Sequence, residues 1–254
     1  WFIKEYMKNS DIEIVSVNTF MEHKEILKRM YDNSDVVLLP NMKPFEIKEM
    51  YGSPCFSKQQ DYIIECYQNG NRKPWVVERV MGVDKNGDSW RKYAINNTAK
   101  RLLLSGELHK ISPKCCKILK KDVFKQYEKI TGKKAILGVR ASEGELRRTK
   151  YNKCLSKDGT FHPLYDLTDD LLHEIEERYS IEVPEIYKYV KRTGCMGCPY
   201  GSYLGDTINE LKLVTKEQRK FLSEYFRESY NVLGIDIELI QAFCGDIEVK
   251  KGGE

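Results

Sequence analysis

The chain has 254 residues, of which 42 are basic, 38 are acidic and 41% are hydrophobic, and its formal net charge is +4. This length and composition fit one large domain, or a domain with a small appendage. The nearly balanced charge excludes a strongly basic protein, in which the net charge alone would indicate a nucleic-acid partner. No apolar run approaches the roughly 18 residues of a membrane span. Eight cysteines at irregular spacing, with no signal peptide, predict a cytoplasmic protein without disulfides.

The first part of the chain alternates short apolar strands with helices. Residues 1–7 resemble the end of an amphipathic helix, strands are predicted over 11–18 and 35–40, and helices over 20–31, 45–51 and 57–68. The continuous apolar run at 35–40 is typical of a strand covered on both faces of a parallel sheet. This alternation predicts an α/β fold with a mostly parallel, twisted sheet flanked by helices.

The rest of the chain is predicted to be largely helical. A break at 69–74 precedes an ambiguous segment, 75–93, whose turn at 84–88 suggests a hairpin. The remaining predictions are helices over 96–106, 113–131, 168–179, 184–194 and 216–230, a third sheet strand over 134–140 and an edge strand over 234–244. We expect a nucleotide-binding domain over 1–148, with an insertion at about 69–106, and a helical, cysteine-bearing part over 149–254.

Four cysteines stand in two close pairs. Cys115 and Cys116 are adjacent, and Cys195 and Cys198 form a C-x-x-C, a spacing that lets two thiolates converge on one metal centre. Adjacent cysteines suit zinc poorly because their side chains diverge, whereas an iron–sulfur cluster is larger and accepts less regular positions. The pattern therefore favours a 4Fe-4S cluster, with zinc, free thiols or a redox pair as alternatives.

Two arginines are the strongest candidates for binding an anion. Arg140 ends the predicted strand at 134–140, and Arg147 lies a turn or so later with Glu143 between them. Guanidinium groups bind phosphate and sulfate through paired hydrogen bonds, so these two side chains could converge on such a group. The alternative is a pair of surface arginines held by Glu143 and Glu145.

Two further places could contact a nucleotide. Asn18 and Thr19 follow the strand at 11–18, and ligands of open α/β sheets bind outside the carboxyl ends of strands; an ordinary strand-end cap is the alternative. Ser57 and Lys58 stand at a helix N-terminus, where backbone donors favour phosphate, although a lysine there is commonly solvated.

Four stretches occur in an order that resembles the phosphoadenosine phosphosulfate reductase family: KCCKILK at 114–120, GVRASE at 138–143, HPLYDLTDD at 162–170 and RTGCMGCP at 192–199. The C-C…C-x-x-C pattern is similar to the cluster-bearing branch, which includes adenylyl-sulfate reductases and reductase-like proteins of phages. The resemblance covers about residues 10–201. It implies a substrate such as ATP or an adenylated sulfate, His162 as a residue that orients it, and an electron donor such as thioredoxin.

Two features of this family are not found in the sequence. Its phosphate loop, Ser-Gly-Gly-x-Asp-Ser, is expected upstream of Trp1, and its Glu-Cys-Gly-x-His tail is matched only faintly by Cys244-Gly-Asp. The missing nucleophile favours ATP-driven sulfur transfer, as in DNA phosphorothioation or RNA thiolation, slightly over sulfate reduction. A non-catalytic nucleotide-binding module is a further alternative. Nucleic acid and an oligomer are left open as partners, and no membrane is expected.

Overall fold

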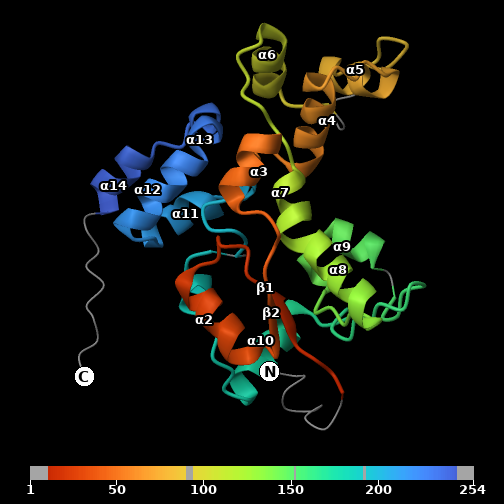
Figure 1. Ribbon diagram of the computed structural model, residues 1–254, viewed down its shortest axis with the longest axis vertical. Helices are drawn as coiled ribbons and strands as arrows, with labels where there is room; N and C mark the ends of the chain where they lie inside the picture. Colours follow the sequence, from red (N-terminus) through yellow and green to blue (C-terminus); the bar gives the residue numbers. More distant parts are fainter. Residues whose placement is uncertain (1–10, 90–93, 152, 191–192, 245–254) are drawn as a thin grey trace.

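The computed structural model describes residues 11–89, 94–151, 153–190 and 193–244. Within them the protein is a mixed α/β protein, mostly helical, whose one sheet consists of two parallel strands, β1 (Val15–Val17) and β2 (Val36–Leu38). Val15 pairs with Val36 and Val17 with Leu38, and helix α2 (Lys24–Asn33) connects the strands (Figure 1). The two strands predicted first are thus confirmed, while the helix expected at 1–7 lies outside the described residues.

The other described elements are helical, and several begin at side chains that cap them. Ser57, Asn96, Thr168 and Thr215 each accept a hydrogen bond from a backbone N–H in the first turn, as N-caps do. In chain order the elements are α3 (Pro44–Tyr51), α4 (Lys58–Gln68), α5 (Pro74–Met81), α6 (Asn97–Ser105), α7 (Lys114–Cys116), η1 (Lys117–Lys121), α8 (Asp122–Thr131), η2 (Ala141–Glu143), α9 (Glu145–Lys150), α10 (Asp169–Arg178), η3 (Glu185–Lys188), η4 (Pro199–Leu204), α11 (Asp206–Leu213), α12 (Lys216–Tyr225), α13 (Arg227–Leu233) and α14 (Ile237–Cys244).

The predicted strands at 134–140 and 234–244 are wrong. The first makes only an isolated bridge from Ile136 to Phe161, so its hydrogen bonds go to a neighbouring loop rather than to β1 or β2. The second is helix α14, whose first turn is capped by Asp236 accepting from the Leu239 N–H at 2.9 Å. β-branched residues suggested a strand here, but this cap and the packing of Ile237 in a core favour a helix.

Two other predictions need correction. Over 75–89, the described part of the hairpin suggested for 75–93, the chain forms helix α5 with Pro74 in its first turn and then a bridge between Val83 and Ser89; residues 90–93 lie outside the described residues. Of the helix predicted over 184–194, the described residues 184–190 and 193–194 contain the short 3-10 turn η3. Among the described helices, none is long and apolar enough to cross a membrane.

Two hydrophobic cores hold the helices together. One is formed by α11 to α14 with Met21 and Met196, and its fully buried aromatic side chains are Tyr225, Phe226 and Tyr230. The other joins α4, α5 and α6, the helices drawn uppermost in Figure 1, and includes Ile63, Val76 and Ala99. The segment 69–106, which was predicted to be an insertion, therefore supplies part of a hydrophobic core. The predicted domain boundary after 148 stays a prediction.

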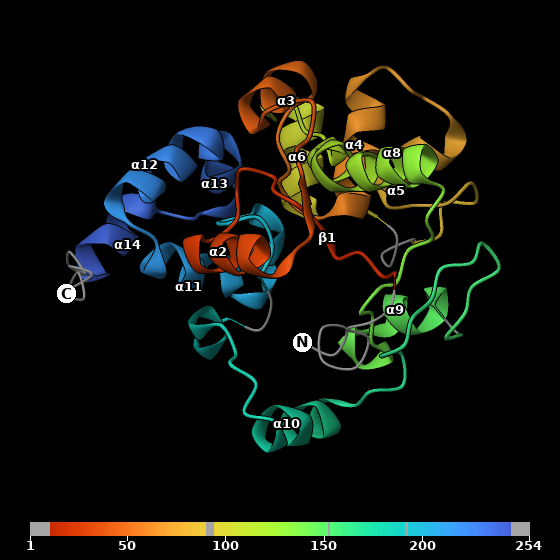
Figure 2. The same cartoon turned by 60° about the horizontal axis from the view of Figure 1, so that its bottom comes forward.

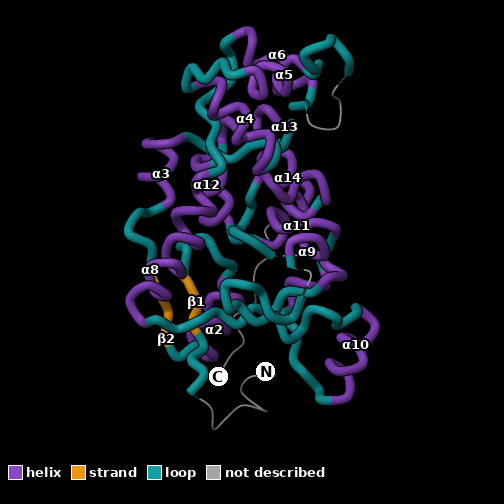
Figure 3. The backbone as a smooth tube through the Cα atoms, turned by 90° about the vertical axis from the view of Figure 1, so that its right-hand side faces the viewer, coloured by secondary structure: helices purple, strands orange, loops and turns teal. Residues whose placement is uncertain are grey.

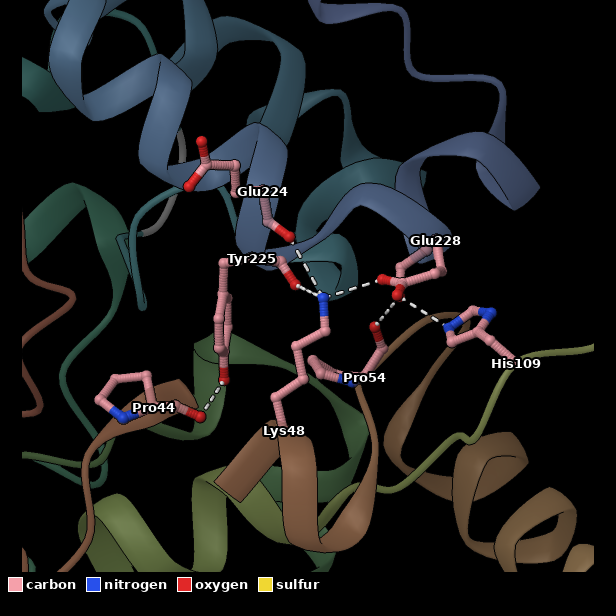
Figure 4. Close-up of polar contacts among 8 residues, drawn as sticks. Pro44, Lys48, Pro54, His109, Glu224, Tyr225 and Glu228 are labelled. Carbon is pink, nitrogen blue, oxygen red and sulfur yellow. Dashed lines mark hydrogen bonds and ion pairs between the residues drawn. The ribbon is translucent and has the colours of Figure 1, made fainter. Parts of the chain in front are cut away.

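The helix predicted over 216–230 is broken into α12 and α13, and Lys48 of α3 stabilises the break. Its ammonium donates to the carbonyl oxygens of Glu224 (3.2 Å) and Tyr225 (2.7 Å) and to the carboxylate of Glu228 (2.9 Å), as Figure 4 shows. Phe226, between the helices, has φ −104° and ψ 12°, outside the helical range. A cation at the C-terminus of α12 satisfies carbonyl groups that the helix leaves unpaired.

Ser229 of α13 fastens the same region to the loop before α4. Its hydroxyl donates to the carbonyl of Pro54 (2.7 Å) and lies 3.1 Å from Nε2 of His109. Burial lowers the pKa of His109, which favours the neutral ring. The C-terminal helices are thereby joined to the part of the chain that contains Lys58.

Candidate cysteine site

Three segments that are distant in sequence meet at the candidate site. They are the loop after β1, helix α7 with its continuation η1, and the loop that contains Cys195 and Cys198. The Met196 N–H donates to the Met21 carbonyl at 2.6 Å, and Oγ1 of Thr19 lies 3.7 Å from Sγ of Cys195. The loop after β1 is thus in direct contact with the C-x-x-C.

The four thiols predicted as ligands influence each other's ionisation. The hydrogen bond with Cys116, and then burial, raise the pKa of Cys115, and the charges of Cys195 and Cys198 raise it further. Burial is the main cause of the raised pKa of Cys195 and of Cys198. Such mutual effects fall off with distance, so the structure brings these four cysteines, from both ends of the resemblance, into one group.

Cys116 differs from the other three. The hydrogen bond with Cys115 lowers its pKa to about 6, and the positive charges of Lys58 and Lys120 contribute. The hydrogen bond with Cys115 and the nearby lysines therefore favour the thiolate form of Cys116. A thiolate is the form in which cysteine binds metals and attacks electrophiles.

Two lysines bring positive charge to the thiols. Lys58, the first residue of α4, hydrogen-bonds Cys116. Lys120 lies 3.8 Å from the carboxylate of Glu22, and the charges of Cys195 and Glu22 raise its pKa against the effect of burial. Lys58 was predicted from its position at a helix start. Lys120 was not singled out, although it stands four residues after Cys116 in a run of lysines.

A single π-helical turn, η1, separates the cysteine pair from α8. Such turns are rare and occur often at functional sites, because they change the register of a helix locally. Here Leu119 is buried, with 1% of its surface exposed, while its neighbour Lys120 reaches Glu22. The sequence pattern of an ordinary helix gave no sign of this turn.

The C-x-x-C loop is held from three sides. The Gly197 N–H donates to Oε2 of Glu210 (2.8 Å), its carbonyl accepts from the Tyr230 hydroxyl, and the Cys198 carbonyl accepts from Thr207 (2.7 Å). Gly197 has φ +62°, a left-handed conformation that glycine adopts without strain. These contacts fix the direction of both thiols before any ligand binds.

Asp61 of α4 connects the cysteine loop to the start of that helix. It is fully buried and accepts hydrogen bonds from the Tyr200 hydroxyl (2.7 Å), the Cys55 N–H (2.7 Å) and the Phe56 N–H (3.0 Å). Burial raises its pKa to about 6 even though these donors oppose the shift. Sequence reasoning missed both Asp61 and Tyr200, because neither belongs to a recognisable motif.

The raised pKa of Asp61 predicts a pH dependence of stability. Because the folded pKa lies above the ordinary 3.8, the protonated form favours folding at low pH, and that contribution is lost as pH rises through about 6. Relative to the parent, Asp61→Asn should therefore gain on the order of 2 kcal/mol of unfolding free energy between pH 4 and pH 7.5. Urea unfolding of both proteins at several pH values measures this, and a difference that stays constant with pH contradicts it.

The predicted arginine pair occupies a different place, next to α10. Arg140 donates to the Asp169 carboxylate at 2.5 Å, and Arg147 lies 3.6 Å from the carboxylate of Glu143. In the described part of the chain no contact joins either arginine to the cysteine group. Both guanidinium groups have carboxylate partners, the arrangement that the surface alternative expected for Arg147.

The other predicted residues have structural partners. The side-chain oxygen of Asn18 accepts from the Phe20 N–H (2.8 Å), which makes Asn18 a strand-end cap, and the Ser57 hydroxyl accepts from the Gln60 N–H (3.2 Å). His162 is fully buried beside the Tyr151 ring, with 4.8 Å between ring centres, and among the described residues neither ring nitrogen has a hydrogen-bond partner. Thr19, the other residue predicted beside Asn18, does touch the cysteine group, because its Oγ1 lies 3.7 Å from Sγ of Cys195.

The four thiols are the donors that this site offers to a metal group. Across the described residues, no three side chains of His, Cys, Asp or Glu converge closely enough to hold a single metal ion. Four mutually interacting thiols, one of them a stabilised thiolate, are nevertheless the donors that a 4Fe-4S cluster requires. Comparison of the chain with protein-family models, curated proteins and solved structures gives no match.

Proposed function

We propose that this protein is an enzyme of the phosphoadenosine phosphosulfate reductase type that acts on an adenine nucleotide or sulfonucleotide and holds a 4Fe-4S cluster. The observation that carries the proposal is the meeting of Cys115, Cys116, Cys195 and Cys198 with Lys58 and Lys120. Cys116 and Cys195 lie on segments that are far apart in sequence, so only the tertiary fold can bring them together. The four cysteines would bind the cluster, and when bound it supplies electronic and electrostatic influence on an adjacent substrate.

The chain's own residues would position an anionic substrate. Lys58 is exposed at the N-terminus of α4 and can neutralise a phosphate or sulfate near the thiols, whereas the charge of Lys120 is partly compensated by Glu22 at 3.8 Å. Arg140 and Arg147 would bind phosphate only where it displaces Asp169 and Glu143 from their guanidinium groups. A nucleotide that contacted the lysines at the thiols and also Arg140 and Arg147 would have to extend from one group of cations to the other.

The two strands would belong to a larger parallel sheet. Among the described residues β2 is the strand paired with β1, and β1, β2 and the helix between them form one βαβ unit. In a mostly parallel, twisted sheet flanked by helices, the loop after β1 lies at the carboxyl edge, where such folds bind ligands. Thr19, which touches Cys195, stands in that loop.

A second chemistry, ATP-driven activation before sulfur transfer, fits the same site. It is favoured by the absence of the reductase tail pattern around Cys244, since reduction needs a cysteine nucleophile. Turnover separates the two: a reductase releases sulfite from adenylyl sulfate when a reductant is supplied, and an ATP-dependent enzyme releases pyrophosphate.

Binding tests the proposal directly. Calorimetric titration with ATP and with adenylyl sulfate should show that Lys58→Gln weakens one of them by about 1.5–3 kcal/mol, the usual scale for hydrogen bonds to charged groups. Lys73→Gln, which removes an exposed lysine just before α5, is the matched control and should bind like the parent. Binding without turnover would indicate the non-catalytic module, and no binding of either nucleotide would refute the proposal.

A further inference from the structure

Four lysines form an inclined row along the helix that follows the cysteine pair. Lys117, Lys121, Lys125 and Lys129 are all exposed and stand four residues apart on η1 and α8. At 1.5 Å per residue, successive lysines lie about 6 Å apart along the helix axis. Residues at this spacing share one side of a helix, so the charges form a line rather than a ring.

Three lysines of this row, Lys121, Lys125 and Lys129, have no counter-charge among the described residues. Lys117 pairs with Asp122 at 2.6 Å, and Lys133, just beyond α8, pairs with Glu13 at 2.7 Å. Within the described chain, no hydrogen bond or ion pair engages Lys121, Lys125 or Lys129. Glu128 is the other carboxylate on α8. Like charges four residues apart destabilise a helix by roughly 0.2–0.5 kcal/mol per pair, so the row costs stability in the free protein.

Helix α8 is also open to solvent. Like α2 and α10 it contains no buried residue, and the hydroxyl of its Tyr127 hydrogen-bonds Glu13. Phe124 and Ile130 are 38% and 75% exposed. Figures 1 and 3 show α8 at the outside of the molecule, beside the two strands. In the view of Figure 2, α8 is drawn in green in the same area as α4 and α6.

We propose that the lysine row on α8 binds the backbone of a nucleic-acid strand. A line of unpaired, flexible ammonium groups matches a linear polyanion and carries no sequence information, as phosphate contacts generally do. The exposed ring of Phe124 adds a surface on which a base can stack. An acidic protein is the competing partner, but a protein interface normally has a fully buried apolar centre, which a single row of lysines does not offer.

The row begins directly after Cys116, so a bound strand would lie next to the cysteine site. The inference rests on α8 alone and does not depend on the cluster or on nucleotide turnover. Loss of nucleotide binding in Lys58→Gln and loss of strand binding in variants of α8 are therefore separate results.

Fluorescence anisotropy with a labelled 20-nucleotide single strand and its duplex tests the proposal on the whole chain. The triple variant Lys121→Gln, Lys125→Gln, Lys129→Gln should bind at least tenfold more weakly at 50 mM salt. The slope of log affinity against log salt should become shallower by roughly 2, since each phosphate contact contributes about 0.7 for single strands. Glutamine keeps the helix propensity, and circular dichroism checks that α8 is retained.

The control variant is Lys212→Gln, Lys216→Gln, Lys220→Gln. It removes the same charge at the same spacing from α11 and α12. If both triple variants weaken binding equally, the effect comes from net charge and the proposal fails. It also fails if the parent binds neither nucleic acid, or if the α8 variant binds them as tightly as the parent.

Discussion

Replacing Cys198 by serine is expected to reduce bound iron from about four per chain to less than one. The prediction assumes anaerobic purification, where the parent should be brown. Three thiolates would remain on Cys115, Cys116 and Cys195, one fewer than the four that hold a 4Fe-4S cluster. Because metal binding and local folding are coupled, the same variant should become sensitive to protease near 110–120 and 190–200 together.

Cys154→Ser is the control for this experiment. Cys154 is exposed, and its thiol contacts Asp166 rather than the other cysteines, so its loss should leave the iron content unchanged. One zinc ion per chain and no iron in the parent would instead favour a structural tetrahedral site. Equal loss of iron in both variants would mean that the cluster is not held by the predicted four cysteines.

Gly197→Ala should lower the free energy of unfolding by about 3 kcal/mol. An alanine there must adopt the left-handed conformation, which costs roughly 1–2 kcal/mol, and overpacking a filled core adds roughly 1–3 kcal/mol. The overpacking arises because the new Cβ would lie 2.7 Å from the Tyr230 hydroxyl and 3.0 Å from a methyl carbon of Leu222. Urea unfolding of the purified variants measures the change.

Gly234→Ala separates the two contributions. Gly234 has φ +68°, close to the φ +62° of Gly197, but no heavy atom lies within 4 Å of the position that a Cβ would take. It should cost only the roughly 1–2 kcal/mol of the backbone conformation. If the two variants were equally stable, the contact between Gly197 and Tyr230 would not be close, and the cysteine loop would be less constrained than the structure indicates.

The sequence alone determined the local elements with strong signals. Caps such as Ser57 and Thr215 and the proline at the start of α3 set where helices begin, since these interactions involve only neighbouring residues. The apolar runs of β1 and β2 also predicted two strands of a parallel sheet, because such strands are covered on both faces. Residues 234–244 were misassigned because their apolar pattern suits a strand or a buried helix, and packing against the C-terminal core decides between them.

The candidate site was partly visible in the sequence. Cysteine spacing identified Cys115, Cys116, Cys195 and Cys198 as a set, and Lys58 was recognised at its helix start. Arg140 and Arg147 were predicted to converge on an anion, but each has a carboxylate partner that the motif did not reveal. Opposite charges that become neighbours only after folding cannot be read from spacing along the chain.

Only the tertiary structure decided how the cysteine site is charged and supported. Asp61 meets Tyr200 across 139 positions of sequence, and Thr19 meets Cys195 across 176. The hydrogen bond with Cys115 is the main cause of the lowered pKa of Cys116, and folding adds the positive charges of Lys58 and Lys120. Local patterns fix which residues start helices and which cysteines form pairs, whereas pKa values and buried hydrogen bonds depend on distances that exist only once the chain is packed.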